Sequence, residues 1–288
     1  MKFLKKLAGA AALSFAFAGA AQAATVLNNW VLNPAGSGFS SGEKINQYLD
    51  LNGLAFIQIT ASADGSFTFK ENGTFISYIH DGGTGYDNGV TLTATFTATG
   101  TGVLGTGAAG TGSFTFSGGT IALYANAGGA NVYNSIAGTN GADVGTLIGT
   151  FNVLAGGGGI VDASGNPVSS GNVTVNAKAS APNGLAADTF FTSNGFDLSA
   201  IDILSYALTG ATSATNVRAT QASEIACEFA GYTANGCGAD YKDSESAFFV
   251  SNSGSFKLND VPEPGSLALF GIAMLGAGFA SRKRASKV

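Results

Sequence analysis

The sequence predicts an all-β fold: an antiparallel β-sandwich or jelly-roll-like single domain with glycine-rich loops and at most one or two short helices. Three observations predict it. Many segments rich in Thr, Phe, Val and Ile alternate hydrophobic and polar residues with a period of two. Asn-Gly and Asp-Gly pairs, which accept the positive φ of tight turns, separate several of these segments. The 288 residues also include 43 glycines, and short strands joined by glycine-containing turns are typical of all-β domains.

Each predicted strand is a short segment with this alternation, and turn pairs lie between several of them. The pairs are Asn52-Gly53, Asp64-Gly65, Asn72-Gly73 and Asp81-Gly82. The predicted strands are residues 54–60, 66–70, 74–79, 90–99, 113–117, 120–124, 146–154, 172–179, 247–250 and 255–258.

Helix is predicted to be a minor component. Residues 223–230 predict two helical turns that end at Gly231, a plausible C-cap. Residues 197–208 are ambiguous between helix and strand, because a capping pattern and a period-two alternation overlap there. The glycine-rich stretches 100–112 and 156–159 are expected to be long loops inside one domain, since the same strand pattern resumes after each.

The composition excludes several classes of protein. Hydrophobic residues make up 45% of the chain and charged residues 11%, which excludes a disordered acidic tail, a coiled coil and a basic nucleic-acid binder. Glycine does not recur at every third position, so collagen is excluded as well. We therefore expect a globular chain that has no nucleic-acid partner.

The first 23 residues have the three parts of a secretory signal peptide. Three lysines precede an apolar run over residues 7–20, and Ala21-Gln22-Ala23 is the small-x-small pattern that signal peptidase accepts. The alternative is an amphipathic first helix, but the apolar run has no polar face. We therefore expect signal peptidase to cut after Ala23.

The other end of the chain has the features of a membrane segment. After Pro262-Glu263-Pro264, residues 265–281 carry no charge, and the basic residues Arg282, Lys283 and Arg284 follow. Seventeen helical residues span about 26 Å, slightly less than a hydrocarbon core of about 30 Å. Basic residues behind the span would hold the C-terminus in the cytoplasm. The two prolines disfavour regular structure around Glu263, so this segment is expected to be extended and accessible to a protease.

These C-terminal features together resemble the PEP-CTERM sorting signal. In that family exosortase, a membrane transpeptidase, recognises the Pro-Glu-Pro element and cleaves near it. The resemblance implies transient insertion in the inner membrane and delivery through the periplasm to the medium, the cell surface or the extracellular matrix. The alternative is a permanent anchor without cleavage. The expected organisation is a signal peptide at 1–23, an extracellular β domain at 24–260, and a sorting signal with its transmembrane helix at 261–288.

Removal of both ends makes the exported part strongly acidic. Seven of the 13 basic residues and one of the 18 acidic residues lie in the ends, which leaves 17 acids, six bases and a net charge of −11. Such a surface repels nucleic acid and anionic lipid and attracts cations. Arg218 is the one arginine in the exported part, so a phosphate-binding site has few suitable residues.

The two cysteines of the chain lie close together in the exported part. Cys227 and Cys237 delimit an 11-residue segment. In an oxidising compartment their default state is a disulfide, worth about 3 kcal/mol for a loop of this size in the chain-entropy model. We therefore predict a structural disulfide.

The candidate catalytic motif is better explained as a turn. Gly38-Phe39-Ser40-Ser41-Gly42 has the letters of a G-x-S-x-G nucleophile elbow, which needs a strand-to-helix turn and a histidine. The single histidine of the chain, His80, stands before a glycine turn and is expected to be solvated. One histidine cannot build a multi-histidine metal site. No residue is therefore assigned a catalytic role.

A weak calcium candidate lies in the glycine loop after His80. Residues 82–90 nearly match one calcium-binding nonapeptide, but such sites form between stacked copies of the repeat, and the chain has one. Asp81, Asp87 and Asn88 still offer oxygen ligands. The alternative is an acidic hairpin loop, and no metal or cofactor is assigned.

The exported part also resembles the flocculation-associated branch of the PEP-CTERM proteins. The resemblance lies in N-W-V-L-N-P at 29–34, E-K-I-N-Q-Y-L-D at 43–50, L-A-G-G-G-G at 154–159, S-E-I-A-C-E-F-A-G at 223–231 and F-F-V-S-N at 248–252. That branch comes from Gram-negative bacteria that make exopolysaccharide, and it is linked to clumping of cells into flocs. It implies a non-enzymatic matrix or surface protein that promotes cell aggregation with exopolysaccharide. The alternatives are a secreted carbohydrate-active enzyme and a calcium-dependent carbohydrate-binding module.

Overall fold

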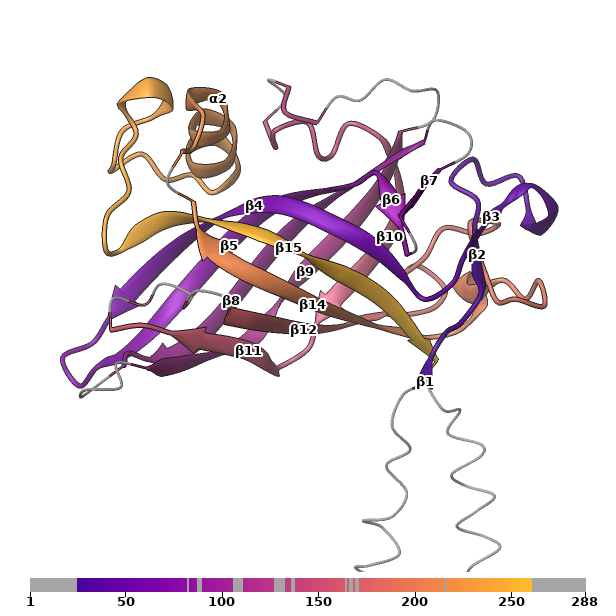
Figure 1. Ribbon diagram of the computed structural model, residues 1–288, viewed down its shortest axis with the longest axis horizontal. Coiled ribbons are helices and arrows are strands. Elements are labelled where there is room, and N and C mark those ends of the chain that lie inside the picture. Colours follow the sequence, from indigo (N-terminus) through magenta and orange to yellow (C-terminus); the bar gives the residue numbers. More distant parts are fainter. Residues whose placement is uncertain are drawn as a thin grey trace, which may run out of the picture. The chain divides into compact units, whose positions relative to one another are not determined.

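The last long strand of the chain pairs with the first one and closes the sheet into a barrel (Figure 1). The computed structural model describes residues 25–81, 83–86, 90–105, 111–126, 133–135, 138–163, 165, 168, 171–214 and 216–260. All but Thr25 and Asp260 belong to one compact unit, Val26–Asn259.

In this part of the chain eight long strands form the ring, and each pairs with the next long strand along the chain. β10 and β11 act as one strand of the ring, because both pair with β9 on one side and β12 on the other. The ring consists of β4 (Tyr48–Ala61), β5 (Ser66–Ser77), β8 (Thr91–Val103), β9 (Gly112–Asn126), β10 (Thr146–Val153) with β11 (Gly156–Val161), β12 (Gly171–Ala179), β14 (Ile203–Ser213) and β15 (Ala247–Asp260).

The prediction of a sandwich or jelly roll is therefore wrong, whereas the all-β class with little helix is confirmed. Period-two alternation gives a strand one buried and one exposed face in a sandwich and in a barrel alike. The difference is whether the first and last strands meet. Here β15 and β4 pair over 11 residues each, from Ala247 opposite Gln58 to Lys257 opposite Tyr48.

The inner face of the barrel is mostly apolar and combines large with small residues. Phenylalanines of β5 lie over glycines of the neighbouring strands: a Cβ added to Gly53 would be 2.3 Å from Phe75 Cδ1, and one added to Gly100 would be 2.3 Å from Phe69 Cε1. The glycines therefore make room for the rings.

Several predicted turns and loops consequently lie inside strands. Asn52-Gly53 is part of β4 and Asn72-Gly73 is part of β5. The two glycine-rich stretches expected to be loops begin in β8 and form most of β11, respectively.

A small second sheet adds its apolar residues to the same core. β13 (Phe190–Phe191), β2 (Trp30–Leu32) and β3 (Glu43–Ile45) form this sheet. Trp30 is fully buried and stacks on Phe190 with 6.1 Å between the ring centroids. The remaining short elements are β1 (Thr25–Val26), η1 (Phe39–Ser41), β6 (Ile79–His80), β7 (Thr84–Gly85), η2 (Leu198–Ala200) and η4 (Gly238–Asp240).

The predicted short helix covers an apolar patch on the outside of the barrel. α2 (Ala219–Gln221) continues into a π-helix, η3 (Ala222–Phe229), and Gly231 follows with a φ of 66°. Ile225 of η3 packs with Phe56 of β4 and Phe249 of β15. The ambiguous segment 197–208 resolves into η2 and the first half of β14.

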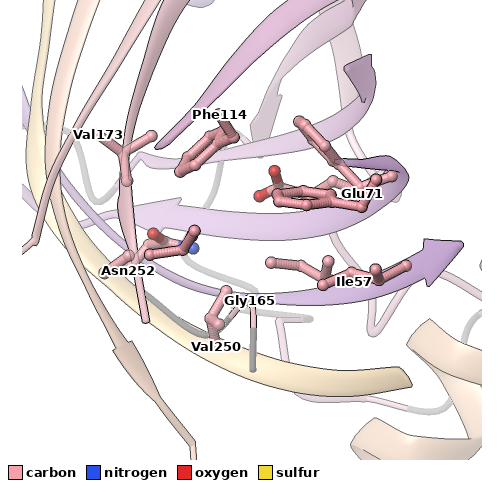
Figure 2. Close-up of a pocket in the computed structure, with 12 residues that line it drawn as sticks. Ile57, Glu71, Phe114, Gly165, Val173, Val250 and Asn252 are labelled. Carbon is pink, nitrogen blue, oxygen red and sulfur yellow. The ribbon is translucent and has the colours of Figure 1, made fainter. Parts of the chain in front are cut away.

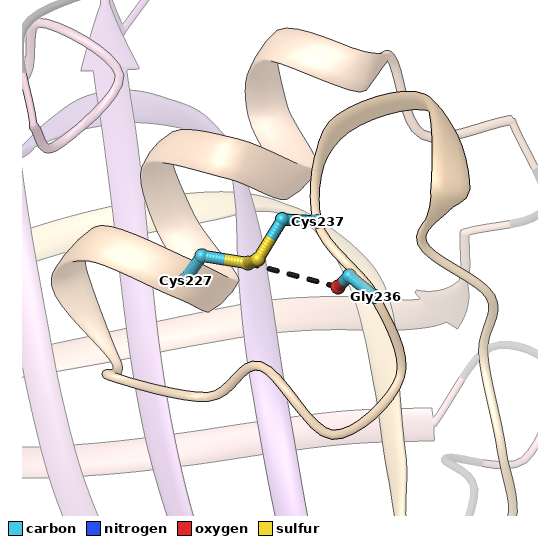
Figure 3. The surroundings of a disulfide bond; sticks show 3 residues. All are labelled: Cys227, Gly236 and Cys237. Carbon is cyan, nitrogen blue, oxygen red and sulfur yellow. Dashed lines mark hydrogen bonds between the residues drawn. A yellow bond between two sulfur atoms is a disulfide. The ribbon is translucent and has the colours of Figure 1, made fainter.

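The predicted disulfide is confirmed. Cys227, near the end of η3, is bonded to Cys237 (Figure 3). The Sγ atom of Cys227 also lies 3.7 Å from the carbonyl oxygen of Gly236. The bond therefore ties the loop after η3 back to the helix.

Replacement of both cysteines by serine is expected to lower the free energy of unfolding by about 3 kcal/mol, because the unfolded chain regains the freedom of the closed loop. Urea unfolding of the double variant, followed by circular dichroism, measures this change. Reduction of the wild type should produce the same loss. An unchanged urea midpoint in both experiments would show that the bond contributes nothing to stability.

Candidate functional site on the outer wall of the barrel

Threonines occupy the outward positions of β8 from Thr91 to Thr101. Leu92, Ala94, Phe96 and Ala98 point into the core, and the threonines alternate with them. The first part of this row is covered, since Thr93 Oγ1 donates to the carbonyl oxygen of Ala142 at 2.6 Å. Thr99 and Thr101 are exposed. The outward threonines of β8 are Thr91, Thr93, Thr95, Thr97, Thr99 and Thr101.

The neighbouring strands extend this exposed part into a surface that we call the hydroxyl wall. In one row across four strands Thr60 lies opposite Thr68, Thr68 opposite Thr101, and Thr101 opposite Thr115. The hydroxyl wall consists of Thr60, Ser66, Thr68, Lys70, Thr97, Thr99, Thr101, Ser113, Thr115 and Ser117.

An open groove of about 410 Å³ crosses this wall. Two rows of outward side chains flank it: the row of Thr68, Thr101 and Thr115, and the next row, in which Val103 pairs with both Ser66 and Ser113. Phe67, Gly102 and Phe114 form the row between them. Both phenylalanine rings point inward and Gly102 has no side chain, so backbone forms the floor of the groove. The groove is lined by Ser62, Ser66, Phe67, Thr68, Thr101, Gly102, Val103, Ser113, Phe114 and Thr115.

The hydroxyl wall differs in charge from the rest of the exported chain. Glu71 is the one acid of β5, β8 and β9, and its side chain points inward. Lys70 is the one charged residue among those that define the wall. Apart from the inward-pointing Glu71, the acid nearest to the residues of the wall along the chain is Asp64, in the turn before β5. Hydrogen bonds from the side chain and backbone of Ser66, at 2.6 and 3.0 Å, hold the pKa of Asp64 below its usual value.

These residues define what the groove can do. A hydroxyl both donates and accepts hydrogen bonds, and none of the described lining residues titrates near neutral pH. General acid–base catalysis needs a titratable group within reach of the substrate. The groove is therefore suited to binding a neutral, hydroxyl-rich ligand rather than to catalysis by its own side chains.

His80 is not a solvated turn residue, so that expectation is wrong. It is 5% exposed in β6, and its Nε2 lies 2.9 Å from Glu43 Oε1 in β3. Its ring also packs against Tyr86, with 5.6 Å between centroids. The histidine thus joins the small sheet to the barrel, because β6 pairs with β4.

The calcium candidate is only partly in the described residues. Both carboxylate oxygens of Asp81 accept backbone N–H groups, from Asn46 at 3.0 Å and Gln47 at 2.8 Å. Asp87 and Asn88 lie outside the described residues. In the described part no group of three or more His, Cys, Asp or Glu side chains is arranged to hold a metal ion. Asp81 therefore has a structural role in the turn before β4.

Ser40 and two tyrosines of the loops, Tyr133 and Tyr232, have structural roles. Ser40 lies in η1, which is followed by strand β3 and not by a helix, so the nucleophile-elbow geometry is absent there. Tyr133 donates to the carbonyl oxygen of Thr74 at 2.9 Å, and Tyr232 packs on Phe56.

Sequence reasoning missed the groove and the buried Glu71. In the alternating segment before Asn72, Glu71 lies on the same face of the strand as Phe67 and Phe69. The alternation alone therefore predicts that its carboxyl points into the core. The register that brings Thr68 and Thr115 onto one row depends on pairing between distant strands, and no local signal predicts it.

The terminal predictions lie outside the described residues: signal cleavage at Ala21 and Ala23, the Pro262-Glu263-Pro264 motif, the membrane segment, and the basic tail at Arg282, Lys283 and Arg284. Among the residues that are described, none of the helices has the length and apolar character needed to span a bilayer.

Comparison with protein families decides the nature of the C-terminus. Residues 260–284 match the family described as the PEP-CTERM protein-sorting motif. The chain carries a PEP-CTERM sorting signal. It is therefore a secreted or cell-surface protein that passes through the membrane and is processed by exosortase. No curated protein and no solved structure matches the chain. The barrel of this PEP-CTERM protein ends where the matched region begins, since β15 ends at Asp260.

Proposed function

We propose that the barrel is a non-enzymatic matrix or surface protein that binds exopolysaccharide through the hydroxyl wall and thereby promotes cell aggregation. The observation that carries the proposal is the groove, which has hydroxyl side chains on both sides and no acid among its described lining residues. The sorting signal supports it, because it directs the barrel to the cell surface or the medium, where the protein would meet an exopolysaccharide.

The charge distribution favours this wall over other faces of the barrel. The exported part has a net charge of −11, and like charge repels acidic polysaccharides. The residues of the wall include Lys70 and no acid, and one carboxylate, that of Asp64, borders the wall at Ser66. A neutral sugar polymer can therefore approach the wall, and Lys70 offers a contact to an acidic one. Rows of hydroxyls match the hydroxyls of sugar rings as donors and acceptors. The repeated rows also suit a polymer better than a single small molecule.

The groove is tested by acids placed in one of its two flanking rows. The double variant Thr101→Asp with Thr115→Asp is expected to bind the host's purified exopolysaccharide at least ten-fold more weakly, because it places two charges in the groove. Co-sedimentation at fixed ionic strength measures the binding. A matched pair of exposed residues on other strands, Thr212→Asp with Ser253→Asp, should bind as the wild type does. Equal loss in both pairs would show a general charge effect and contradict the groove as the binding site.

The non-enzymatic part of the proposal is tested separately. Incubation of the polysaccharide with the exported protein should leave the length of the polymer unchanged, with and without a calcium chelator. A shortened polymer, with the effect abolished by one Asp or Glu substitution, would instead support a secreted carbohydrate-active enzyme. Loss of binding in the chelator would support a calcium-dependent module.

The cellular role is tested in the producing organism. Deletion of the gene is expected to reduce aggregation and retention of polysaccharide, and complementation with the Thr101→Asp, Thr115→Asp variant should fail to restore either. Full aggregation in the deletion strain would contradict the role.

A further inference from the structure

The inside of the barrel contains two polar side chains without partners. Glu71 of β5 is 8% exposed and Asn252 of β15 is 6% exposed. Among the described residues no hydrogen bond or ion pair involves either side chain, and both side chains line cavities. Burial is the one cause that raises the pKa of Glu71, which agrees with the absence of a neighbouring charge. An unsatisfied polar group in an apolar interior is costly, and an unpaired charge is more so.

Two cavities flank this pair of side chains. They have volumes of about 30 and 50 Å³, and Glu71, Val173 and Asn252 line both. Figure 2 shows the carboxyl of Glu71 pointing into the space between Phe114, Val173 and Asn252. The carboxyl of Glu71 is therefore directed into the cavities and not at the wall of the barrel.

The remaining walls of the cavities are rich in phenylalanine. Rings from β5, β8 and β9 contact one another edge to face, with 5.4 to 6.3 Å between centroids along a continuous chain. Glu71 is the one titratable side chain among the described residues that line either cavity. The rings are Phe67, Phe69 and Phe114 at the smaller cavity and Phe75, Phe96, Phe116 and Phe256 at the larger one.

This combination is suited to an organic cation. A carboxylate supplies the counter-charge, and aromatic faces attract cations through their quadrupole, most strongly where water is excluded. A metal ion such as Ca²⁺ needs six or more oxygen ligands, and the cavities offer one carboxyl and few other oxygens. The acidic exported surface, with its net charge of −11, also raises the local concentration of cations.

We propose that the interior of the barrel binds a small primary alkylammonium ion. Its ammonium group would lie between the carboxylate of Glu71 and the side-chain carbonyl of Asn252, and its short alkyl group would contact the phenylalanine rings. One water molecule needs roughly 10 to 15 Å³ of such space, so each cavity has room for a few non-hydrogen atoms. Methylammonium to propylammonium is the size range that fits. This site is separate from the hydroxyl wall and does not depend on the proposed function.

The experiment compares propylammonium with 1-propanol, which has the same shape and no charge. Each is titrated into the exported protein at pH 9 and pH 5, with sodium chloride at matched ionic strength, and the thermal unfolding midpoint is recorded. Propylammonium is expected to raise the midpoint saturably at pH 9, where Glu71 is ionised. At pH 5 the effect should be at least ten-fold weaker, because burial raises the pKa of Glu71 to about 8 and a proton competes with the cation. Propanol should have no saturable effect at either pH.

Two matched variants identify the site. Glu71→Gln keeps the shape of the protonated side chain and removes the charge, so it should fold and should bind propylammonium at least ten-fold more weakly. Glu245→Gln makes the same chemical change at an exposed position and should bind normally. Equal stabilisation by propanol and propylammonium, or by propylammonium in wild type and Glu71→Gln, would overturn the proposal. The absence of any saturable rise in the unfolding midpoint with propylammonium would also overturn it.

Discussion

Replacement of Glu71 by glutamine is expected to stabilise the barrel by several kcal/mol at alkaline pH and hardly at all below pH 5. Burial raises the pKa of this carboxyl from 4.5 to about 8 in the folded protein. Between these values the folded state keeps a proton that the unfolded state has released. The free energy of unfolding of the wild type therefore falls as the pH rises, by roughly 1 kcal/mol for each pH unit, and the fall ends near the folded-state pKa.

The glutamine variant lacks this proton, so its stability should not show the slope. By pH 9 the difference from the wild type is expected to be on the order of 4 kcal/mol. Urea unfolding at unit steps from pH 4 to pH 9 measures it. Glu245→Gln, at an exposed position, should follow the wild-type curve. Parallel curves for wild type and Glu71→Gln would mean that the carboxyl is hydrated and titrates near its usual pKa.

The two experiments on Glu71 answer different questions. The pH dependence of stability measures how strongly the barrel interior opposes a bare carboxylate. The alkylammonium titration asks whether a cation relieves that cost. A steep pH dependence without cation binding would describe a carboxyl that is neutral in the folded protein. Cation binding in addition would explain why Glu71 and Asn252 face the same two cavities. Apolar side chains at these two positions would fill the interior without leaving a polar group unsatisfied.

How far the sequence predicts this structure depends on whether a feature is local. The alternation over residues 91–101 predicts one inward and one outward face for β8, and the structure has both. Gly231 predicts the end of the helical segment because the requirement for positive φ is a local one. The disulfide between Cys227 and Cys237 also follows from nearby positions and the oxidising compartment.

Closure of the barrel could not be predicted in the same way. It depends on β15 meeting β4, strands that are about 200 residues apart in the chain, and the same alternation is compatible with two packed sheets. Glycines added to the difficulty, since Gly53 and Gly100 look like turn residues but provide space for phenylalanine rings. The groove was missed for a related reason: its two rows exist only once β5, β8 and β9 are in register.

Loss of the sorting motif is expected to change where the protein goes without changing how it folds. Replacement of Glu263 by alanine removes the acid of the Pro-Glu-Pro element in the matched region 260–284. Exosortase should then fail to cut, so the protein should keep Val288 and remain with the membrane fraction. Intact-mass analysis of the medium and the membranes measures both outcomes. Release of a normally cut product would show that Glu263 is not needed for recognition.

The expectation that folding is unchanged follows from where the barrel ends. β15 reaches Asp260, so a cut within the motif leaves all 11 pairs between β15 and β4 in place. The uncut Glu263→Ala protein and the mature product should therefore share one thermal unfolding midpoint. Deletion of residues 247–288 instead removes the closing strand, with the buried Phe249 and Phe256, and exposes the edges of β4 and β14. That variant should fail to fold, and a cooperative unfolding transition in it would show that closure by β15 is not what holds the sheet together.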